Sequence, residues 1–352
     1  MKLAAFQSQF GPETKILVTG HTGFKGTWLT LLLEQLGYEV CGLSLEAEVG
    51  SLFQRLERSG KIQEKIVDVR NYHEVSSAMS SLKPNLIFHL AAQPLVLTSY
   101  SQPRETFETN VMGTVNILES AFNTNSVSHI SVITTDKVYR NEENGRKFAE
   151  GDPLAGKDPY SASKVGTEAA VSAWIQLAKS MDGPSVISLR AGNVIGGGDF
   201  AEYRLLPDLV RGFQNREPVE IRSPLSTRPW QHVLDPLSGY LLAAAVSHSG
   251  HGETSYNFAP EGVSLSVKDV CEIAVAAWGT DAKIEFKDDP YVLEAKSLEL
   301  NASLARKELD WQPKWTQEEA VKSTINWWKR TLQEPKSAPK ACLEDLHTLL
   351  SN

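Results

Sequence analysis

The chain has 352 residues, of which 41% are hydrophobic, and a formal net charge of -8 at pH 7. A chain of this length and composition can bury one large core or two modest ones, so intrinsic disorder is excluded as the default state. The negative charge argues against nucleic acid or an acidic membrane surface as a partner, although local groups can still hold a nucleotide.

The cysteine and histidine content argues against a disulfide framework and against a metal site. The three cysteines are scattered along the chain, and His248 and His251 have no third ligand nearby. Every apolar run is shorter than the ~18 residues of a membrane span, and Met1 to Gly11 contains only a very short one. We therefore expect a cytoplasmic protein that binds neither metal nor membrane.

The first strong pattern is a strand, a glycine loop and a helix. The apolar run Lys15 to Gly20 leads into glycines at positions 20, 23 and 26 and then into the helical pattern Trp28 to Leu36. Such glycines permit a tight turn and let backbone N–H groups approach a pyrophosphate at the helix N-terminus. A turn in any α/β protein is the alternative. The predicted cofactor-binding loop comprises Gly20, Thr22, Gly23, Phe24, Lys25 and Gly26.

The next three strand-like runs end at residues that can contact a dinucleotide. Glu39 to Leu45 offers Ser44 where a fold that prefers NAD places an acid on the ribose 2′-hydroxyl, and Glu46 follows. Because no arginine cluster is present to receive a 2′-phosphate, we predict NAD rather than NADP. Lys61 to Val67 and Asn85 to Leu90 predict two more strands. Candidate cofactor contacts at these ends are Ser44, Asp68, Val69, Leu90, Ala91, Ala92 and Gln93.

The middle of the chain continues the alternation of helix and strand. We predict one long helix from Tyr100 to Asn123, a strand from His129 to Thr134, a helix from Tyr160 to about Met181 and a strand from Ser185 to Arg190. Asn110, inside the first of these helices, is either bonded to backbone or part of the cofactor site. Six alternations predict an α/β, Rossmann-type doubly wound parallel sheet with the ligand crevice at the strand ends.

After the sixth strand the pattern changes to shorter helices and strands, which predicts a smaller α+β substrate-binding domain. We assign residues 1–190 to a dinucleotide-binding domain, to which the chain is expected to return around 230–260, and 191–332 mainly to substrate binding. Residues 333–352 are predicted to be a tail. Arg222 and the segment Arg228 to His232 are either solvated surface groups or a clamp for a nucleotide diphosphate.

Tyr160 and Lys164 are the strongest candidates for catalytic groups. A phenol and an ammonium four residues apart on a helix project from one face, so the lysine charge is expected to lower the tyrosine pKa from about 10. A solvated pair would have the same spacing. Placement favours catalysis, because the pair follows a strand that ends where a cofactor would bind.

Together these motifs resemble the CDP-glucose 4,6-dehydratases, a branch of the extended short-chain dehydrogenases/reductases that acts on nucleotide sugars. The resemblance covers about residues 15–330. It is carried by the glycine loop, Thr135-Asp136-Lys137, Tyr160 with Lys164, Arg190 to Asp199, and Arg228 to His232. The related dTDP-glucose dehydratases have glutamate at the position of Lys137, so this lysine points to the CDP-sugar branch.

The resemblance implies bound NAD, a nucleotide-sugar substrate and a homodimer formed through the helices near 100–123 and 158–181, often paired into a homotetramer. It makes Asp68 the adenine-side acid and adds Asn110 and Thr134 to the cofactor site. The implied catalytic residues are Thr135, Asp136, Lys137, Tyr160 and Lys164. The implied substrate residues are Gln93, Asn193, Asp199, Arg204, Leu206, Arg222, Arg228 and His232.

The implied reaction converts CDP-D-glucose to CDP-4-keto-6-deoxy-D-glucose and water. Tyr160 takes the proton of the 4-hydroxyl while C4 gives hydride to NAD, and Thr135 hydrogen-bonds the same oxygen. Lys137, neutral in a dry pocket, removes the C5 proton, and protonated Asp136 donates to the departing 6-hydroxyl before hydride returns to C6. The alternative is that Lys137 and Asp136 form a structural ion pair.

Two stretches depart from the family pattern near the expected sugar pocket. Leu97 stands where an arginine is expected, and Glu143 to Phe148 replaces an aromatic stretch. A dehydratase acting on another nucleotide sugar is therefore an alternative. A nucleotide-sugar 4-epimerase or reductase, which needs no acid and base at 136 and 137, is another, and a non-catalytic NAD(P)-binding sensor is the third.

Overall fold

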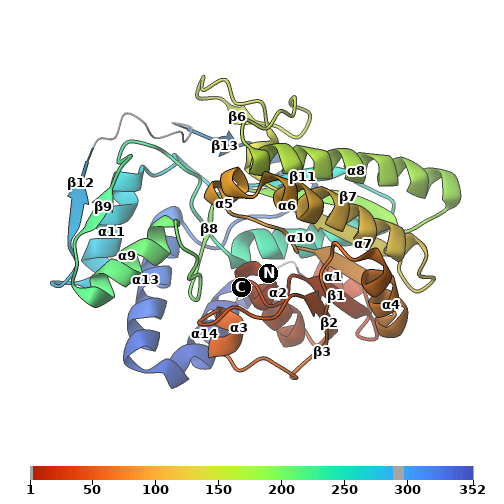
Figure 1. The fold of residues 1–352 in the computed structure, drawn as a ribbon, viewed down its shortest axis with the longest axis horizontal. Helices are drawn as coiled ribbons and strands as arrows, with labels where there is room; N and C mark the ends of the chain where they lie inside the picture. The colour runs from red at the N-terminus through yellow and green to blue at the C-terminus, as the bar shows by residue number, and fades with distance from the viewer. Residues whose placement is uncertain (1–2, 288–296, 352) are drawn as a thin grey trace.

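A seven-stranded parallel sheet forms the centre of the computed structural model, which describes residues 3–287 and 297–351 (Figure 1). The strand order is β11-β7-β5-β4-β1-β2-β3, so the chain reverses direction across the sheet after β3. The α/β doubly wound fold is thus confirmed. The strands are β1 Lys15–Thr19, β2 Glu39–Ser44, β3 Gln63–Ile66, β4 Leu86–His89, β5 His129–Ile133, β7 Ser185–Ala191 and β11 Ser255–Phe258.

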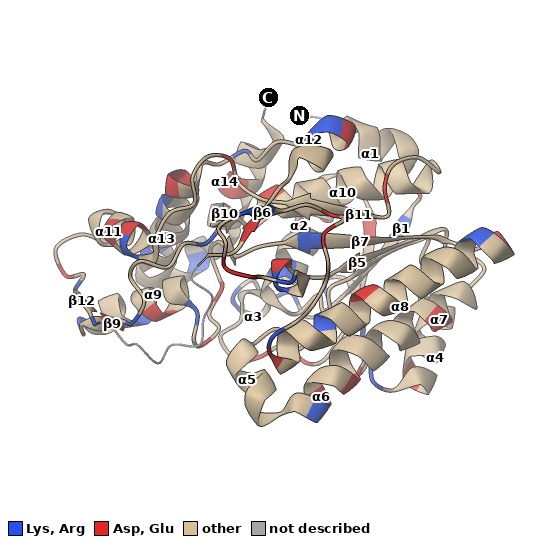
Figure 2. Cartoon of the chain, turned by 90° about the horizontal axis from the view of Figure 1, so that it is seen from above, with Lys and Arg blue, Asp and Glu red and all other residues tan. Residues whose placement is uncertain are grey.

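Helices cover both faces of this sheet because its strands are apolar on both sides. In β1, Ile16 and Val18 join one hydrophobic cluster while Leu17 joins the other, as the two-residue period of a strand requires. Figure 2 shows the two helical layers. One contains α1 Ala4–Gln9, α2 Phe24–Gln35 and α10 Leu234–His248, and the other contains α4 Tyr72–Leu82, α7 Gly113–Phe122 and α8 Pro159–Met181.

A smaller group of elements lies beyond one end of the main sheet (Figure 1). Its helices are α9 Leu205–Asn215, α11 Val267–Trp278 and α13 Gln317–Gln333, and its strands β9 Val219–Ile221 and β12 Ile284–Phe286 pair in parallel. Two more short parallel pairs connect distant segments: β6 Lys147–Phe148 with β13 Glu299–Leu300, and β8 Val194–Ile195 with β10 Gln231–His232. Within the described residues, none of the helices has the length and apolar character needed to cross a membrane.

The ends of the chain are packed rather than free. Helix α1 buries Phe6 against Phe10 and Tyr38, with ring centroids 5.0 and 5.3 Å away. Helix α14 (Ala338–Leu350) buries Leu346 and Leu349 and packs on α13 and α10. Further short elements are α3 Leu52–Arg55, η2 Asp136–Val138, α12 Ser303–Leu309 and η3 Pro335–Ser337.

The prediction of one continuous helix from Tyr100 to Asn123 is wrong. The structure has α5 Val96–Ser101, α6 Pro103–Phe107, the π-helical turn η1 Glu108–Met112 and then α7. Pro103 starts a new helix because it lacks an N–H group and Gln102 before it is non-helical, with φ -131° and ψ 56°. The π turn carries Asn110, and π turns of this kind often lie at functional sites.

A buried ion pair joins helix α8 to the sheet. The Arg190 guanidinium donates to both carboxylate oxygens of Glu168 at 2.8 Å, and both residues are about 95% buried. Thr134 and Ser188 donate to the same carboxylate at 2.5 and 2.9 Å. Burial alone would raise the pKa of Glu168, but the hydrogen bonds and charge of Arg190 hold that pKa below its usual range.

We expect the substitution Glu168→Gln to destabilise the protein strongly, because it leaves the Arg190 charge buried without a counter-ion. The expected loss is about 3–5 kcal/mol in the free energy of unfolding, measured by urea titration. Glu318→Gln is the control, since it breaks an exposed i,i+4 pair with Lys322 and should cost less than about 1 kcal/mol.

The contribution of Glu168 to the free energy of unfolding should decrease as the pH is lowered. Because the pKa of Glu168 is lowered in the folded protein, its contribution is complete above the unfolded value of about 4.3 and is lost as the pH falls toward the folded value. Equal urea midpoints for the Glu168 and Glu318 variants at pH 7 would contradict a stabilising role for the buried pair.

Candidate functional site

The candidate site lies where β1, β4 and β5 end and where helices α2 and α8 begin. Helix α8 starts at Pro159 because Asp158 caps it: the Asp158 carboxylate accepts from Ser161 N at 2.9 Å, and Ser161 Oγ returns a bond to Asp158. This start places Tyr160 in the first turn of the helix, beside the end of β5.

The glycine loop has the geometry of a phosphate cradle. Gly20 has φ +71°, and a Cβ there would lie 2.9 Å from the Ala91 backbone nitrogen. A Cβ on Gly26 would lie 2.0 Å from the Gly20 carbonyl oxygen, so helix α2 can approach β1 only without a side chain there. Gly23 is exposed at the N-cap of α2. The residues present therefore fit a pyrophosphate at this helix N-terminus.

The segment after β4 is fixed by the π turn. Asn110 accepts from Gln93 N at 2.8 Å and donates to the Gln93 carbonyl at 3.1 Å and to Ser163 on α8 at 2.9 Å. Its side chain therefore joins the β4 tip to helix α8. Leu90 and Ala91 N–H groups donate to Thr19 Oγ1 at 3.1 Å. The small, half-buried Ala91 and Ala92 leave the backbone accessible beside the glycine loop.

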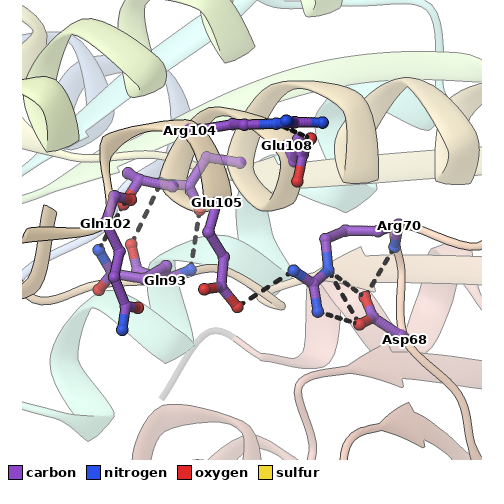
Figure 3. A network of polar contacts seen from close by, with 9 residues as sticks. Asp68, Arg70, Gln93, Gln102, Arg104, Glu105 and Glu108 are labelled. Carbon is purple, nitrogen blue, oxygen red and sulfur yellow. Dashed lines mark hydrogen bonds and ion pairs between the residues drawn. The ribbon is translucent and has the colours of Figure 1, made fainter.

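Further predicted cofactor contacts lie on the other side of β1, near the ends of β2 and β3. Thr22 and Ser44 share a hydrogen bond of 2.7 Å between their hydroxyl oxygens, and both are buried. Asp68, beyond the end of β3, is held by the Arg70 guanidinium (Figure 3). Val69 between them is buried against Gly113, where an added Cβ would lie 2.7 Å from its side chain.

The tip of β5 presents Thr135 and Asp136. Thr135 Oγ1 donates to Asp136 Oδ1 at 3.0 Å, while the Asp136 side chain is only 1% exposed. Asp136 Oδ2 is buried without a hydrogen-bond partner in the described part of the chain. A buried carboxylate oxygen without a partner is costly, so its presence at the site suggests that a ligand group satisfies it.

Lys137 does not lie in a dry pocket. Its side chain is 31% exposed, and its ammonium is 3.6 Å from Asp136 Oδ1. The ion pair offered as the alternative is thus the arrangement in this structure, and the expected desolvation of Lys137 is absent here. The buried lysines of the site are instead Lys164 and the ammonium of Lys25.

Tyr160 and Lys164 are both buried, as their positions on one helix face predict. The Lys164 ammonium, however, donates to the Ile133 carbonyl at 3.1 Å. Burial raises the pKa of Tyr160 to about 12, against a hydrogen bond with Thr135 that lowers it. The predicted lowering of the Tyr160 pKa by Lys164 is therefore wrong for this state. Burial lowers the pKa of Lys164 to about 8, with Glu168 opposing.

Lys25 extends from the first turn of α2 into the site, which its place in the glycine loop did not indicate. Its ammonium donates to the hydroxyl of Tyr240 on α10 at 3.3 Å. Burial of that ammonium, with the charges of Arg204 and Lys164, lowers the pKa of Lys25 to about 7. Tyr240 is fully buried and lies in no motif, so no sequence pattern indicated its place at the site. Phe24 beside Lys25 is half-buried near Gly196.

Of the predicted substrate residues, Arg204 and Asp199 bond to each other. Arg204, at the N-cap of α9, donates to Asp199 at 3.1 Å, and Asp199 is 3% exposed. The charge of Arg204 acts on Tyr160 and Lys25, which places it at the same site. Asn193 is half-buried, and its carbonyl accepts from Gln231 N at 3.2 Å.

The remaining predicted substrate residues do not share one placement. His232 is fully buried, stacked on Trp315 with centroids 4.1 Å apart, and Leu206 is 2% exposed in the core. Arg222 is 68% exposed and pairs with Glu220 at 3.7 Å. Arg228 is buried and donates to the Thr227 carbonyl at 2.8 Å.

Known proteins of similar sequence and structure agree with this geometry. The CDP-glucose 4,6-dehydratase of Salmonella typhimurium is 40% identical over 329 residues, or 91% of this chain and 92% of that protein. The dTDP-glucose 4,6-dehydratase of Bacillus anthracis in complex with NAD has TM-score 0.76 and 25% identity, covering 91% of this chain and 98% of that one.

The fold is shared more widely. The Thermotoga maritima UDP-glucose 4-epimerase with UDP-glucose has TM-score 0.79 at 23% identity, covering 91% of this chain and all of that one. The family profile described as GDP-mannose 4,6 dehydratase matches residues 17–324. The chain therefore belongs to the GDP-mannose 4,6 dehydratase family.

Proposed function

We propose that the protein is an NAD-dependent nucleotide-sugar 4,6-dehydratase that converts CDP-D-glucose to CDP-4-keto-6-deoxy-D-glucose and water. The observation that carries the proposal is the placement of Thr135, Asp136 and Lys137 at the tip of β5, next to Tyr160 and Lys164 of α8. The 40% identity to a CDP-glucose 4,6-dehydratase over most of both chains supports the substrate assignment.

Residues around the strand ends fit NAD. Gly20, Gly23 and Gly26 would hold the pyrophosphate, Ser44 and Asp68 the adenosine half, and Lys164 the nicotinamide half. Bound NAD supplies a hydride acceptor for C4 of the sugar and later a hydride donor for C6. Lys25, Lys164 and Arg204 bring basic groups to the site, alongside the carboxylates of Asp136 and Asp199. Basic groups in a cleft attract anionic ligands such as those with diphosphate groups.

In the first step Tyr160 takes the proton of the sugar 4-hydroxyl. With its pKa near 12, the phenol is protonated at neutral pH. A positively charged side chain must therefore stabilise the phenolate for this transfer. The ammonium of Lys164 and the guanidinium of Arg204 are the nearby positive groups on the chain. Thr135, which already hydrogen-bonds Tyr160, is positioned to donate to the same sugar oxygen.

The elimination needs a base for the C5 proton and an acid for the 6-hydroxyl. Asp136 Oδ2 has no partner in the described structure and is free to serve the departing oxygen. Lys137 must leave Asp136 and lose its exposure to water to act as the base. Closing of the site around a sugar would provide both changes, because removing water favours the neutral amine.

The substitution Tyr160→Phe should lower turnover of CDP-glucose on the order of 10²- to 10⁴-fold, because it removes the base of the first step. Product is measured by the alkaline absorbance of the 4-keto sugar. Tyr100→Phe is the control, since Tyr100 is 51% exposed on α5. Turnover of the Tyr160 variant within threefold of wild type would place the base elsewhere.

Replacing Lys137 with methionine keeps most of the side-chain length and removes the base, so elimination should stall after oxidation. Solvent deuterium should then no longer enter the product at C5, as measured by mass spectrometry. Lys157→Met provides the control, because Lys157 is exposed and pairs loosely with Glu143 at 3.9 Å. Deuterium at C5 formed at the wild-type rate would exclude Lys137 as the base and favour its role as a structural ion pair.

We also propose a homodimer or homotetramer in the cytoplasm. Three free, buried cysteines fit a reducing compartment. Large apolar side chains are exposed along α5, η1 and α8, including Tyr100, Met112 and Leu177 at 51%, 51% and 40%. Such a group of exposed apolar residues is typical of a protein interface.

The substitution Leu177→Arg should therefore shift the mass measured by light scattering toward that of a monomer. The same substitution at Val263, an exposed apolar residue outside these helices, is the control and should leave the mass unchanged. A monomeric wild type would contradict the assembly proposal.

A further inference from the structure

Asp68, which lies just beyond the end of the edge strand β3, is held by Arg70. Arg70 N and Nε donate to Asp68 Oδ1 at 2.9 and 3.0 Å, while Nε and Nη2 donate to Oδ2 at 2.9 and 2.5 Å. Figure 3 shows the guanidinium facing this carboxylate edge to edge. Hydrogen bonding by Arg70 holds the pKa of Asp68 below its usual range. One rotamer of Asp68 is thereby selected.

Arg70 is held in turn by helix α6. Its Nη1 donates to Glu105 Oε1, 35 residues further along the chain, at 3.1 Å, so one guanidinium joins the carboxylates of Asp68 and Glu105 (Figure 3). The backbone is fixed as well, because Asn116 of α7 donates to the Val69 carbonyl at 2.8 Å and to the Arg70 carbonyl at 3.1 Å. Helices α6 and α7 therefore hold both the main chain and the side chain of the Arg70 position.

Strand order tells which half of a dinucleotide meets Asp68. The pyrophosphate cradle lies after β1, and Tyr160 lies on the side of β4 and β5. A dinucleotide with its nicotinamide beside Tyr160 must extend its adenosine half in the opposite direction, over β2 and β3. Asp68 lies just beyond the end of β3, at this far edge, where a carboxylate can accept from the amino group of a purine ring.

These ion pairs are too exposed to matter much for stability. The side chains of Arg70, Asp68 and Glu105 are 36%, 30% and 48% exposed, and such surface pairs contribute about 0–1 kcal/mol. A bidentate arginine–carboxylate pair does fix the relative orientation of its two groups. Loss of this pair should therefore change ligand affinity rather than the stability of the fold.

We propose that Arg70 and Glu105 are positioning residues for the adenine end of the dinucleotide: Arg70 orients the Asp68 carboxylate, and Glu105 orients Arg70. The proposal rests on the proposed use of NAD, and it adds two residues outside the glycine loop that determine its affinity. Neither residue is expected to touch the nicotinamide or the sugar, so their effect is confined to the adenosine half.

A second explanation makes a different prediction. If Arg70 acted only by its positive charge on the phosphates, lysine would replace it. If it acts by its planar, two-pronged geometry, lysine cannot replace it, because an ammonium cannot bind both carboxylate oxygens in that way. The variant Arg70→Lys therefore separates orientation from charge, and Arg70→Met removes both.

The test is calorimetric titration of the full-length protein with NAD and with ADP-ribose, which keeps the adenosine half and lacks nicotinamide. Arg70→Met and Arg70→Lys should each weaken both ligands by the same factor, about tenfold, as expected for one oriented hydrogen bond to a charged group. Glu105→Gln should weaken both by about threefold. Arg104→Met is the matched control, because it breaks only the exposed Arg104–Glu108 pair on the same helices (Figure 3), and it should bind like wild type.

Thermal melting of each variant without ligand keeps the result interpretable, since the melting temperatures should agree within about 2 °C for so exposed a pair. Wild-type affinity in Arg70→Lys would overturn the positioning role in favour of charge. Unchanged affinity in Arg70→Met, with a wild type that binds both ligands, would overturn this inference alone. A wild type that binds neither ligand would overturn the proposed use of NAD and this inference with it.

Discussion

The buried pair of Glu168 and Arg190 is the constraint on which the site depends. Two charges can be removed from water only if their remaining hydrogen-bonding capacity is satisfied, and here Thr134, Ser188 and Tyr139 provide those bonds. Thr134 precedes Thr135 and Asp136 at the tip of β5. Because Glu168 lies one turn beyond Lys164 on α8, the same pair fixes this helix against β5, whose tip carries Thr135 and Asp136.

Bonds made by Arg190 and Tyr139 also connect the Glu168–Arg190 pair to the segment before α8 and to β11. Arg190 also donates to the Glu150 carbonyl at 3.0 Å, and Tyr139 donates to Asn257 on β11 at 2.8 Å. The segment between β5 and α8 is thereby attached to the edge of the sheet. Phe148 of this segment stacks on Tyr139 at 5.2 Å, so the stretch that departs from the family pattern has an aromatic residue in the core.

The sequence predicts well what depends on local spacing. Glycines at 20, 23 and 26 could be assigned to a tight loop because each has a steric reason, and the shared face of Tyr160 and Lys164 follows from helix geometry. The pKa of Tyr160 could not be predicted in this way. It depends on how deeply α8 is buried and on the Ile133 carbonyl that binds Lys164, which are properties of the tertiary structure.

The contacts that the sequence analysis missed join segments that are far apart in the chain. Lys25 meets Tyr240, 215 residues away, and Arg70 meets Glu105 on a helix whose break at Pro103 and π turn at Asn110 were not predicted. The π turn was not predicted because it depends on tertiary contacts. The Asn110 amide is hydrogen-bonded to Gln93 and Ser163, and those bonds favour the wider turn over a regular helix. An Arg-Pro-Trp-Gln-His motif likewise does not reveal that its last residue, His232, packs between Trp28 and Trp315.

The late position of β11 in the chain has a consequence for protein synthesis. Ser255–Phe258 pairs with β7, so the outer edge of β7 stays open on the ribosome until a further stretch of chain, including α9 and α10, has emerged. An open strand edge is a template for pairing with another chain. During synthesis there must therefore be a period in which β7, with Arg190, can pack against helix α8 but cannot yet pair with β11. Rapid translation of the chain between β7 and β11 would shorten that period, and a chaperone that covers the β7 edge would protect it, so that each would favour correct folding over aggregation.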